Sequence, residues 1–160
     1  MMSYCTVSKN KKDKVKKFAE VFTSAGVVFE MCLQEGLREV ISNVDKTIFD
    51  PAVGEGQFPC AELVLKMFFN VERLDEEIAL RALNSLYGMD IQQASVDKAH
   101  AHLIATLRDA FFFFTGKNFS EFESAKEIVA DHITCGDSLA YMKKLAQEKM
   151  ARNFSLSIED

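Results

Sequence analysis

The sequence lacks an apolar run long enough to cross a membrane, and it lacks a closely spaced pair of cysteines. The longest uncharged apolar stretch, residues 110–114 with four consecutive Phe, is far shorter than the roughly 20 residues that a spanning helix needs. The first residues contain no apolar core of a signal peptide. Cys5, Cys32, Cys60 and Cys135 are widely spaced, which argues against a zinc site or a disulfide framework. We therefore expect a cytoplasmic protein with free thiols and no membrane partner.

Positive charge is also scarce. The chain has 19 Lys and Arg against 24 Asp and Glu, a net charge of −5, which argues against a domain that binds nucleic acid by general electrostatics. The exception is a group of lysines between residues 9 and 17. It could follow a phosphate backbone, but a solvated arm is the commoner meaning. We predict a basic N-terminal arm over residues 1–13, with DNA contacted only indirectly or weakly.

What the chain does contain is a glycine loop between a predicted strand and a predicted helix. Residues 46–49 are a short β-like run, residues 50–58 contain two glycines, and residues 60–69 have a helical apolar pattern. Glycine allows positive φ and lets a ligand approach the backbone, and Pro59 fits the first turn of a helix. This is the order in which an α/β domain builds a nucleotide-type pocket. A tight turn without a ligand is the alternative.

The loop reads D-P-A-V-G-E-G-Q-F. Its pattern, D-P-A-x-G-x-G-x-F, resembles the S-adenosylmethionine-binding loop of adenine-specific DNA methyltransferases, with Val53 where the family usually has Cys. The resemblance implies that the glycines and the backbone between them bind the methionine part of the cofactor. It also implies that the aspartate fixes the loop and can meet the amino group. The candidate cofactor-binding residues of this loop are Asp50, Pro51, Ala52, Gly54, Glu55 and Gly56.

Two later segments also resemble motifs of this family. The segment Y-G-M-D-I matches Y-G-x-D-I, which implies that Asp90 accepts hydrogen bonds from the ribose hydroxyls and that Ile91 flanks the adenine ring. The segment ending in G-D-S-L matches G-D-x-L, which implies that Asp137, followed by Ser138, accepts from the adenine amino group. The alternative in both places is an acid or a serine that caps the following helix.

The segment that precedes the glycine loop gives a weaker resemblance. F-A-E-V-F-T is similar to the family's G-E-x-F-T-P, which packs over the methionine end of the cofactor. Phe22 and Thr23 match this pattern, whereas Ala19 and Ser24 replace the usual Gly and Pro. A helix-loop-helix with a buried Phe is the alternative.

Apolar spacing predicts the remaining elements. Helices are expected over residues 14–22, 25–41, 60–71, 76–86, 93–114 and 139–150, with a loop over 115–124 and a short turn over 126–131. His100 and His102 are two residues apart, so on a helix they face different sides and cannot jointly bind a metal. We expect one methyltransferase-like cofactor-binding domain over residues 14–152, followed by a flexible tail over 153–160.

One motif that the resemblance calls for is missing. Adenine-specific methyltransferases carry (D/N/S)-P-P-(Y/F), which holds the flipped base, but Pro51 and Pro59 are the only prolines of this sequence. No target-recognition region is evident either. We therefore predict an α/β protein with a partial Rossmann-like class I methyltransferase fold: three parallel strands in the order 3-2-1, flanking helices and an incomplete sheet. The first strand would form an open edge, which a second polypeptide or a self-partner is expected to cover.

Three functions remain open. The first is the S-adenosylmethionine-binding portion of a DNA adenine methyltransferase, inactive alone because the catalytic motif is absent. The second is a non-catalytic cofactor-binding or interaction subunit that docks on a methyltransferase or restriction partner. The third is a nicotinamide-dependent oxidoreductase, against which the missing third glycine of the dinucleotide fingerprint argues, because Pro59 stands in its place.

Overall fold

Three short parallel strands, β1 (Ile48–Asp50), β2 (Leu86–Asp90) and β3 (Ile133–Cys135), form an open sheet in the order β1-β2-β3. The computed structural model describes residues 24–156, with side chains as far as residue 149. The helices are α2 (Ala25–Cys32), α3 (Leu37–Ser42), α4 (Gln57–Phe69), α5 (Glu76–Asn84), α6 (Gln93–Thr115), α7 (Phe122–His132) and α8 (Ser138–Leu156), with the short 3-10 helix η1 (Val71–Arg73) before α5. The predicted α/β class, the parallel pairing and the strand order are confirmed.

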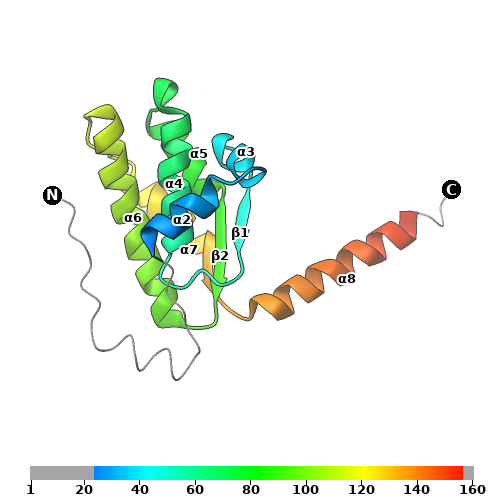
Figure 1. Cartoon of the computed structure of the whole chain (residues 1–160). Helices are drawn as coiled ribbons and strands as arrows, with labels where there is room; N and C mark the ends of the chain where they lie inside the picture. The colour runs from blue at the N-terminus through cyan, green and yellow to red at the C-terminus, as the bar shows by residue number, and fades with distance from the viewer. Residues whose placement is uncertain (1–23, 157–160) are drawn as a thin grey trace.

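The helices between the strands cover one face of the sheet (Figure 1). Both crossovers, β1 to β2 and β2 to β3, step in the same direction across the sheet, and crossovers of this kind are right-handed, so α4, α5, α6 and α7 lie on the same side. Leu63 and Met67 of α4 and Leu103 and Leu107 of α6 are fully buried there. Burying a side chain of this size contributes about 1.5–3 kcal/mol, so this helical layer is the main source of stability.

The opposite face has little cover among the described residues. Phe49 is 36% exposed, and Tyr87 and Met89 are only partly buried. Two described helical segments approach it: the first turns of α8, through a ring contact of 5.9 Å between the centroids of Phe49 and Tyr141, and the end of α7, where His132 stacks on Tyr87 at 4.0 Å. Beyond these turns α8 extends away from the rest of the chain (Figure 1).

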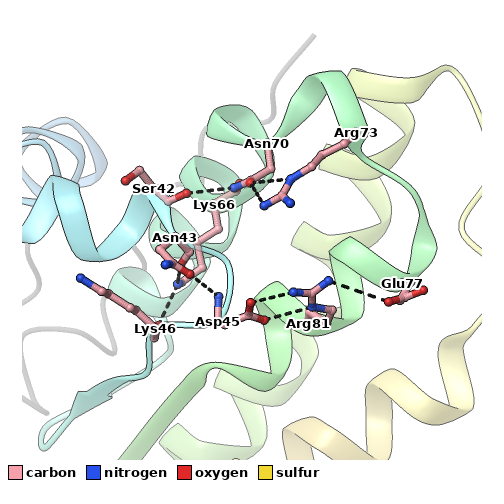
Figure 2. A network of polar contacts seen from close by, with 9 residues as sticks. All are labelled: Ser42, Asn43, Asp45, Lys46, Lys66, Asn70, Arg73, Glu77 and Arg81. Atoms are coloured by element: carbon pink, nitrogen blue, oxygen red, sulfur yellow. Dashed lines mark hydrogen bonds and ion pairs between the residues drawn. The ribbon is translucent and has the colours of Figure 1, made fainter.

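A buried lysine fixes the chain where it enters β1 (Figure 2). Nζ of Lys66 donates to the carbonyl oxygens of Asn43 at 2.8 Å and Lys46 at 3.0 Å. The amide of Asn70 donates to the carbonyl oxygens of Ser42 at 3.1 Å and Lys66 at 2.8 Å. Buried carbonyl groups need a donor, and α4 supplies it from one of its faces. The connection from α3 to β1 is thereby held against the middle of α4.

Two helix predictions were wrong in extent. The helix expected over residues 25–41 is two helices: α2 ends at Cys32, and Gly36, with φ 86°, is the N-cap residue of α3. Ser24 is the N-cap residue of α2, although its side chain makes no capping hydrogen bond. The loop and short turn expected between residues 115 and 131 contain the 11-residue helix α7, whose Ala125 and Val129 are buried in the core.

The ends of the chain bear on two further expectations. α8 continues to Leu156, beyond the expected helix end at residue 150 and into the stretch expected to be a tail. The basic arm over residues 1–13 and the helix expected over residues 14–22 lie outside the described residues. No helix in the described part of the chain is long and apolar enough to cross a membrane.

Candidate functional site

The turns that follow the three strands meet at one edge of the sheet. The backbone N–H of Val53, in the loop after β1, donates to the carbonyl of Met89 at 3.1 Å, and the N–H of Gly136, after β3, donates to the carbonyl of Asp90 at 2.9 Å. In open parallel sheets, ligands bind outside the carboxyl ends of the strands. The candidate site is therefore this edge, where the sequence placed its glycines and acids.

The glycine loop has the backbone that glycine allows. Gly54 has φ 53° and Gly56 has φ 85°, and Gly56 is the N-cap residue of α4. A Cβ on Gly56 would lie 3.1 Å from Cα and Cβ of Ala99, so α6 also packs directly on the loop. A side chain at this position would meet both the positive φ and the close helix. The N–H groups of Gly54 and Gly56 are bonded to Asp90 and Val53, so the N–H groups without an intrahelical acceptor at the start of α4 are those of Gln57 and Phe58.

Asp90 connects the second turn to the glycine loop. Its Oδ2 accepts from the N–H of Gly54 at 3.0 Å, and its Oδ1 accepts from the N–H of Gln92 at 2.9 Å. A carboxylate has about four lone-pair positions, so each oxygen retains capacity for one more donor. The bond to Gln92 fixes the turn before α6. This agrees in part with the alternative that Asp90 serves the start of the following helix and not a ligand. The bond to Gly54, 36 residues away in the sequence, goes beyond that alternative.

Asp50 fixes its own loop, as the resemblance implied. Its Oδ1 accepts from the N–H of Ala52 at 2.9 Å. Burial raises the pKa of Asp50, the bond from Ala52 opposes this, and the nearby charge of Asp90 raises it further. Pro51 and Ala52 form the exposed tip of the turn. The charge of Asp50 interacts with that of Asp90 and with that of Glu62 on α4.

Sequence reasoning missed Glu62, a third acid near this edge. It lies on α4 and is 5% exposed. Burial raises its pKa to about 7, the charge of Asp50 adds to this, and the charge of Lys66 opposes it. The only signal for it in the sequence is an acid inside an apolar helical run. Together the three acids make the buried side of this edge favourable to a positively charged ligand.

The third acid-bearing turn has a different role in the structure. Oδ1 of Asp137 accepts from the N–H of Ala140 at 3.0 Å, so this exposed side chain caps α8. Ser138 is the first residue of that helix. The capping role proposed as the alternative is therefore present, and a capping carboxylate can still accept from a ligand. Ile91, at the tip of the second turn, is 72% exposed in the described part of the chain.

Glu55 points toward α6. Its carboxylate forms an ion pair with Lys98 at 2.8 Å, and its backbone carbonyl lies 2.7 Å from Nδ1 of His102. Nε2 of the other histidine on this helix, His100, lies 2.7 Å from the carbonyl of Ile133. The two histidines thus connect α6 to different parts of the fold, and among the described residues no group of His, Cys, Asp and Glu is arranged to bind a metal.

A cavity of about 510 Å³ lies beside the glycine loop, between α2, α4 and α6. Glu55 and Gly56 line it from the loop, and Ala25 and Val28 line it from α2. Asp50, Asp90 and Asp137 do not line it, so the predicted site residues do not share one closed pocket. Phe22 and Thr23 lie outside the described residues, but the chain enters α2 at this cavity only two residues later.

Comparisons of this chain with protein-family models, with curated proteins and with solved structures give no match.

Proposed function

We propose that this chain is the S-adenosylmethionine-binding portion of a DNA adenine methyltransferase. The observation that supports it most directly is the hydrogen bond from the N–H of Gly54 to the carboxylate of Asp90. It joins the loop proposed for the methionine part to the acid proposed for the ribose. The two halves of a nucleoside-type ligand could therefore be bound by neighbouring backbone turns at the carboxyl edge of a parallel sheet.

Charge favours this cofactor over a nicotinamide dinucleotide. S-adenosylmethionine carries a positive sulfonium and an ammonium group, whereas a dinucleotide carries an anionic pyrophosphate. Asp50 and Asp90 bring negative charge to this edge, and Glu62, whose pKa burial raises to about 7, becomes ionised there when a cation binds beside it. Like charges repel and opposite charges attract more strongly where water is partly excluded. Asp50 and Glu62 would stabilise the ammonium group, and a pyrophosphate there would be destabilised.

In this proposal each turn binds one part of the cofactor. The first N–H groups of α4, at Gln57 and Phe58, donate to the methionine carboxylate. Gly54 and Gly56, whose own N–H groups are bonded within the fold, shape the loop against which the methionine part lies. Asp90 uses its remaining lone pairs for the ribose hydroxyls, Ile91 covers one side of the adenine, and Asp137 accepts from the adenine amino group. The cofactor supplies the methyl group, and this chain binds and orients it.

The second candidate function is a non-catalytic cofactor-binding or interaction subunit of a cytoplasmic methyltransferase or restriction partner. The absence of a Pro-Pro motif favours it, since Pro51 and Pro59 are the only prolines of the sequence. Both functions predict that the purified chain transfers no methyl group to DNA. Radiolabel from the cofactor appearing in DNA treated with this chain alone would contradict both.

Calorimetric titration of the full chain with S-adenosylmethionine and, separately, with NAD tests the cofactor class. We expect heat of binding with the first and none with the second. Asp90→Ala should weaken binding by about 1.5–3 kcal/mol, the scale of a lost charge-assisted hydrogen bond. Glu127→Ala on the exposed side of α7 is the matched control. Unchanged affinity in Asp90→Ala would remove Asp90 from the site, and binding of NAD alone would reject the proposal.

A further inference from the structure

The sheet face opposite α4 to α7 contains an apolar groove. Its volume is about 560 Å³, and Phe49, Tyr87 and Met89 line it from the sheet. Tyr141 and Leu145 line it from the beginning of α8. Apolar side chains gathered on one open surface mark a place where another polypeptide packs.

The outer edge of β1 borders this groove and has unused hydrogen-bonding groups. The N–H of Ile48 donates to the carbonyl of Ser85 at 2.9 Å, so Ile48 directs its backbone groups toward β2. Backbone groups alternate along a strand, and the N–H and carbonyl of Phe49 therefore point away from the sheet. No strand pairs with them in the described part of the chain. An edge of this kind is a template for a further strand.

α8 begins beside the sheet and extends away from it on the side of β1 (Figure 1). Its 19 residues span about 28 Å, at 1.5 Å per residue. Leu139 is 65% exposed, Met142 is 36% exposed and Leu145 is 45% exposed. A helix with an apolar stripe is stable in water only when that stripe is buried. Tyr141 and Leu145 lie at the groove of their own chain, and the rest of α8 extends past the sheet (Figure 1).

We propose that two copies of this chain form a twofold dimer in which their β1 strands pair antiparallel and each α8 covers the apolar groove of the other copy. In an antiparallel pair, two opposing residues exchange both of their backbone hydrogen bonds. Phe49 can do this with Phe49 of the second copy, because one N–H and one carbonyl of each face outward. The α8 helix of each copy then lies under the other copy's sheet, since it already extends past its own β1.

Charge complementarity favours a second copy as the occupant. Residues 24–137 carry nineteen Asp and Glu against nine Lys and Arg, whereas residues 138–156 carry four Lys and Arg against one Glu. Asp131, which is exposed, lines the groove that the partner helix would enter. The basic α8 of one copy is therefore attracted to the acidic residues 24–137 of the other copy. In a twofold dimer this contact occurs twice, once for each α8.

The dimer is independent of the proposed cofactor site. Antiparallel pairing of the β1 strands directs their carboxyl ends in opposite directions, so the two candidate sites lie at opposite ends of the joined sheet. Loss of the dimer should leave cofactor binding in place, and loss of cofactor binding should leave the dimer in place. The two proposals can therefore fail separately.

Sedimentation equilibrium of the full chain tests the dimer. We expect a mass twice the 18.0 kDa of the chain. Leu145→Lys places a charge in the groove and should weaken dimerisation at least tenfold, because the side chain is exposed in the single copy and tolerates lysine there. Phe113→Lys, on a side chain that is 77% exposed at the end of α6, is the matched control and should leave the mass unchanged. A monomer at every concentration, or a dimer that Leu145→Lys does not weaken, overturns the proposal.

A cross-link tests the pairing of β1. Hydrogen-bonded residues in an antiparallel pair have Cα atoms about 5.5 Å apart, within the range that a disulfide bridges. Phe49→Cys, in a background with Cys5→Ser and Cys135→Ser, should therefore form a covalent dimer on oxidation. Phe113→Cys in the same background should not. Absence of the Phe49→Cys dimer, or equal cross-linking at both positions, overturns the pairing.

Discussion

The two ends of β1 are fixed by side chains of opposite charge. At the amino end, the ammonium group of Lys66 donates to the carbonyls of Asn43 and Lys46. At the carboxyl end, the carboxylate of Asp90 accepts from the N–H of Gly54 and Gln92. The backbone that enters β1 presents carbonyl groups that need a donor, and Lys66 supplies it. The glycine loop that leaves β1 presents N–H groups that need an acceptor, and Asp90 supplies it.

The two ends differ in what remains available to a ligand. Lys66 is fully buried, so no ligand can reach its ammonium group. Asp90 is only partly buried, and the exposed Ile91 follows it. The amino end is thus a closed structural contact, whereas the carboxyl end keeps acceptor capacity and an uncovered apolar side chain. The difference locates the candidate site at one end of the strand on physical grounds alone.

Lys66→Met should have the largest effect on stability. Methionine fills a similar volume, but the carbonyls of Asn43 and Lys46 lose their donor. Hydrogen bonds from a charged group contribute about 1.5–3 kcal/mol, and Lys66 makes two of them, to the carbonyls of Asn43 and Lys46. We expect a loss of about 3 kcal/mol in the free energy of unfolding, measured by urea denaturation with circular dichroism.

Lys126→Met is the control for this substitution. Lys126 lies on the exposed side of α7 and pairs with Glu123 at 2.8 Å. Exposed pairs contribute about 0–1 kcal/mol, so the control should change stability little. Equal effects of the two substitutions would show that Lys66 does not hold the amino end of β1.

Gly88→Ala should have the next largest effect on stability, because the added Cβ would meet Val53 of the glycine loop. A Cβ at Gly88 would lie 2.8 Å from Cγ2 and 2.9 Å from Cβ of Val53. Overpacking of a core costs about 1–3 kcal/mol, so we expect a loss within that range in thermal or urea unfolding. Adding Val53→Ala should restore part of the loss, since the Cγ2 contact disappears and the Cβ contact stays. Purely additive effects would mean that the two side chains do not meet.

The carboxyl end of β1 was largely predictable from the sequence. Each of the three strands is a short apolar run that ends at or near an acid or a glycine, and the right-handed crossover rule then orders parallel strands from local signals. The Gly54 and Gly56 loop followed from the need for positive φ. Asp90 could be placed at the end of β2, although its bond to Gly54 depends on strand register, which the sequence alone did not provide.

The amino end and the bare face were not predictable in the same way. Lys66 and Glu62 lie in an apolar helical run, and hydrophobic periodicity says nothing about which carbonyl or carboxylate a long side chain will meet across the fold. The α7 helix was missed because only Ala125 and Val129 of it are fully buried, a pattern too sparse to separate from a loop. Such contacts depend on tertiary packing, which overrides local propensity.

Glu62→Gln should remove a pH dependence from folding. The folded pKa of Glu62 is raised from the model-compound value of 4.5 to about 7, so between these values the folded protein holds a proton that the unfolded chain releases. Stability contributed by this group therefore falls as pH rises from about 4.5 to 7. We expect Glu62→Gln to be more stable than the wild type by about 1–2 kcal/mol at pH 8 and equal at pH 5.

Urea denaturation at several pH values measures this difference. Glu123→Gln, on an exposed acid of α7, is the matched control and should leave the pH profile unchanged. The free energy of unfolding of the wild type is compared with that of Glu62→Gln at each pH. If the difference does not change between pH 5 and pH 7, Glu62 is ionised in the folded protein at both pH values.

Ile91→Ser should have the smallest effect on folding and a clear effect on ligand binding. Because the side chain is 72% exposed, its removal changes the free energy of unfolding by less than about 0.5 kcal/mol, as is usual for surface substitutions. If it covers the adenine of S-adenosylmethionine, its loss removes about 1–2 kcal/mol of apolar contact, which is about a five- to thirtyfold weaker affinity in calorimetry. Val71→Ser, at a side chain 42% exposed outside the candidate site, should leave the affinity unchanged. Equal affinities of wild type and Ile91→Ser would mean that the adenine does not contact Ile91. The exposed apolar side chain at the carboxyl end would then not be evidence for a ligand site there.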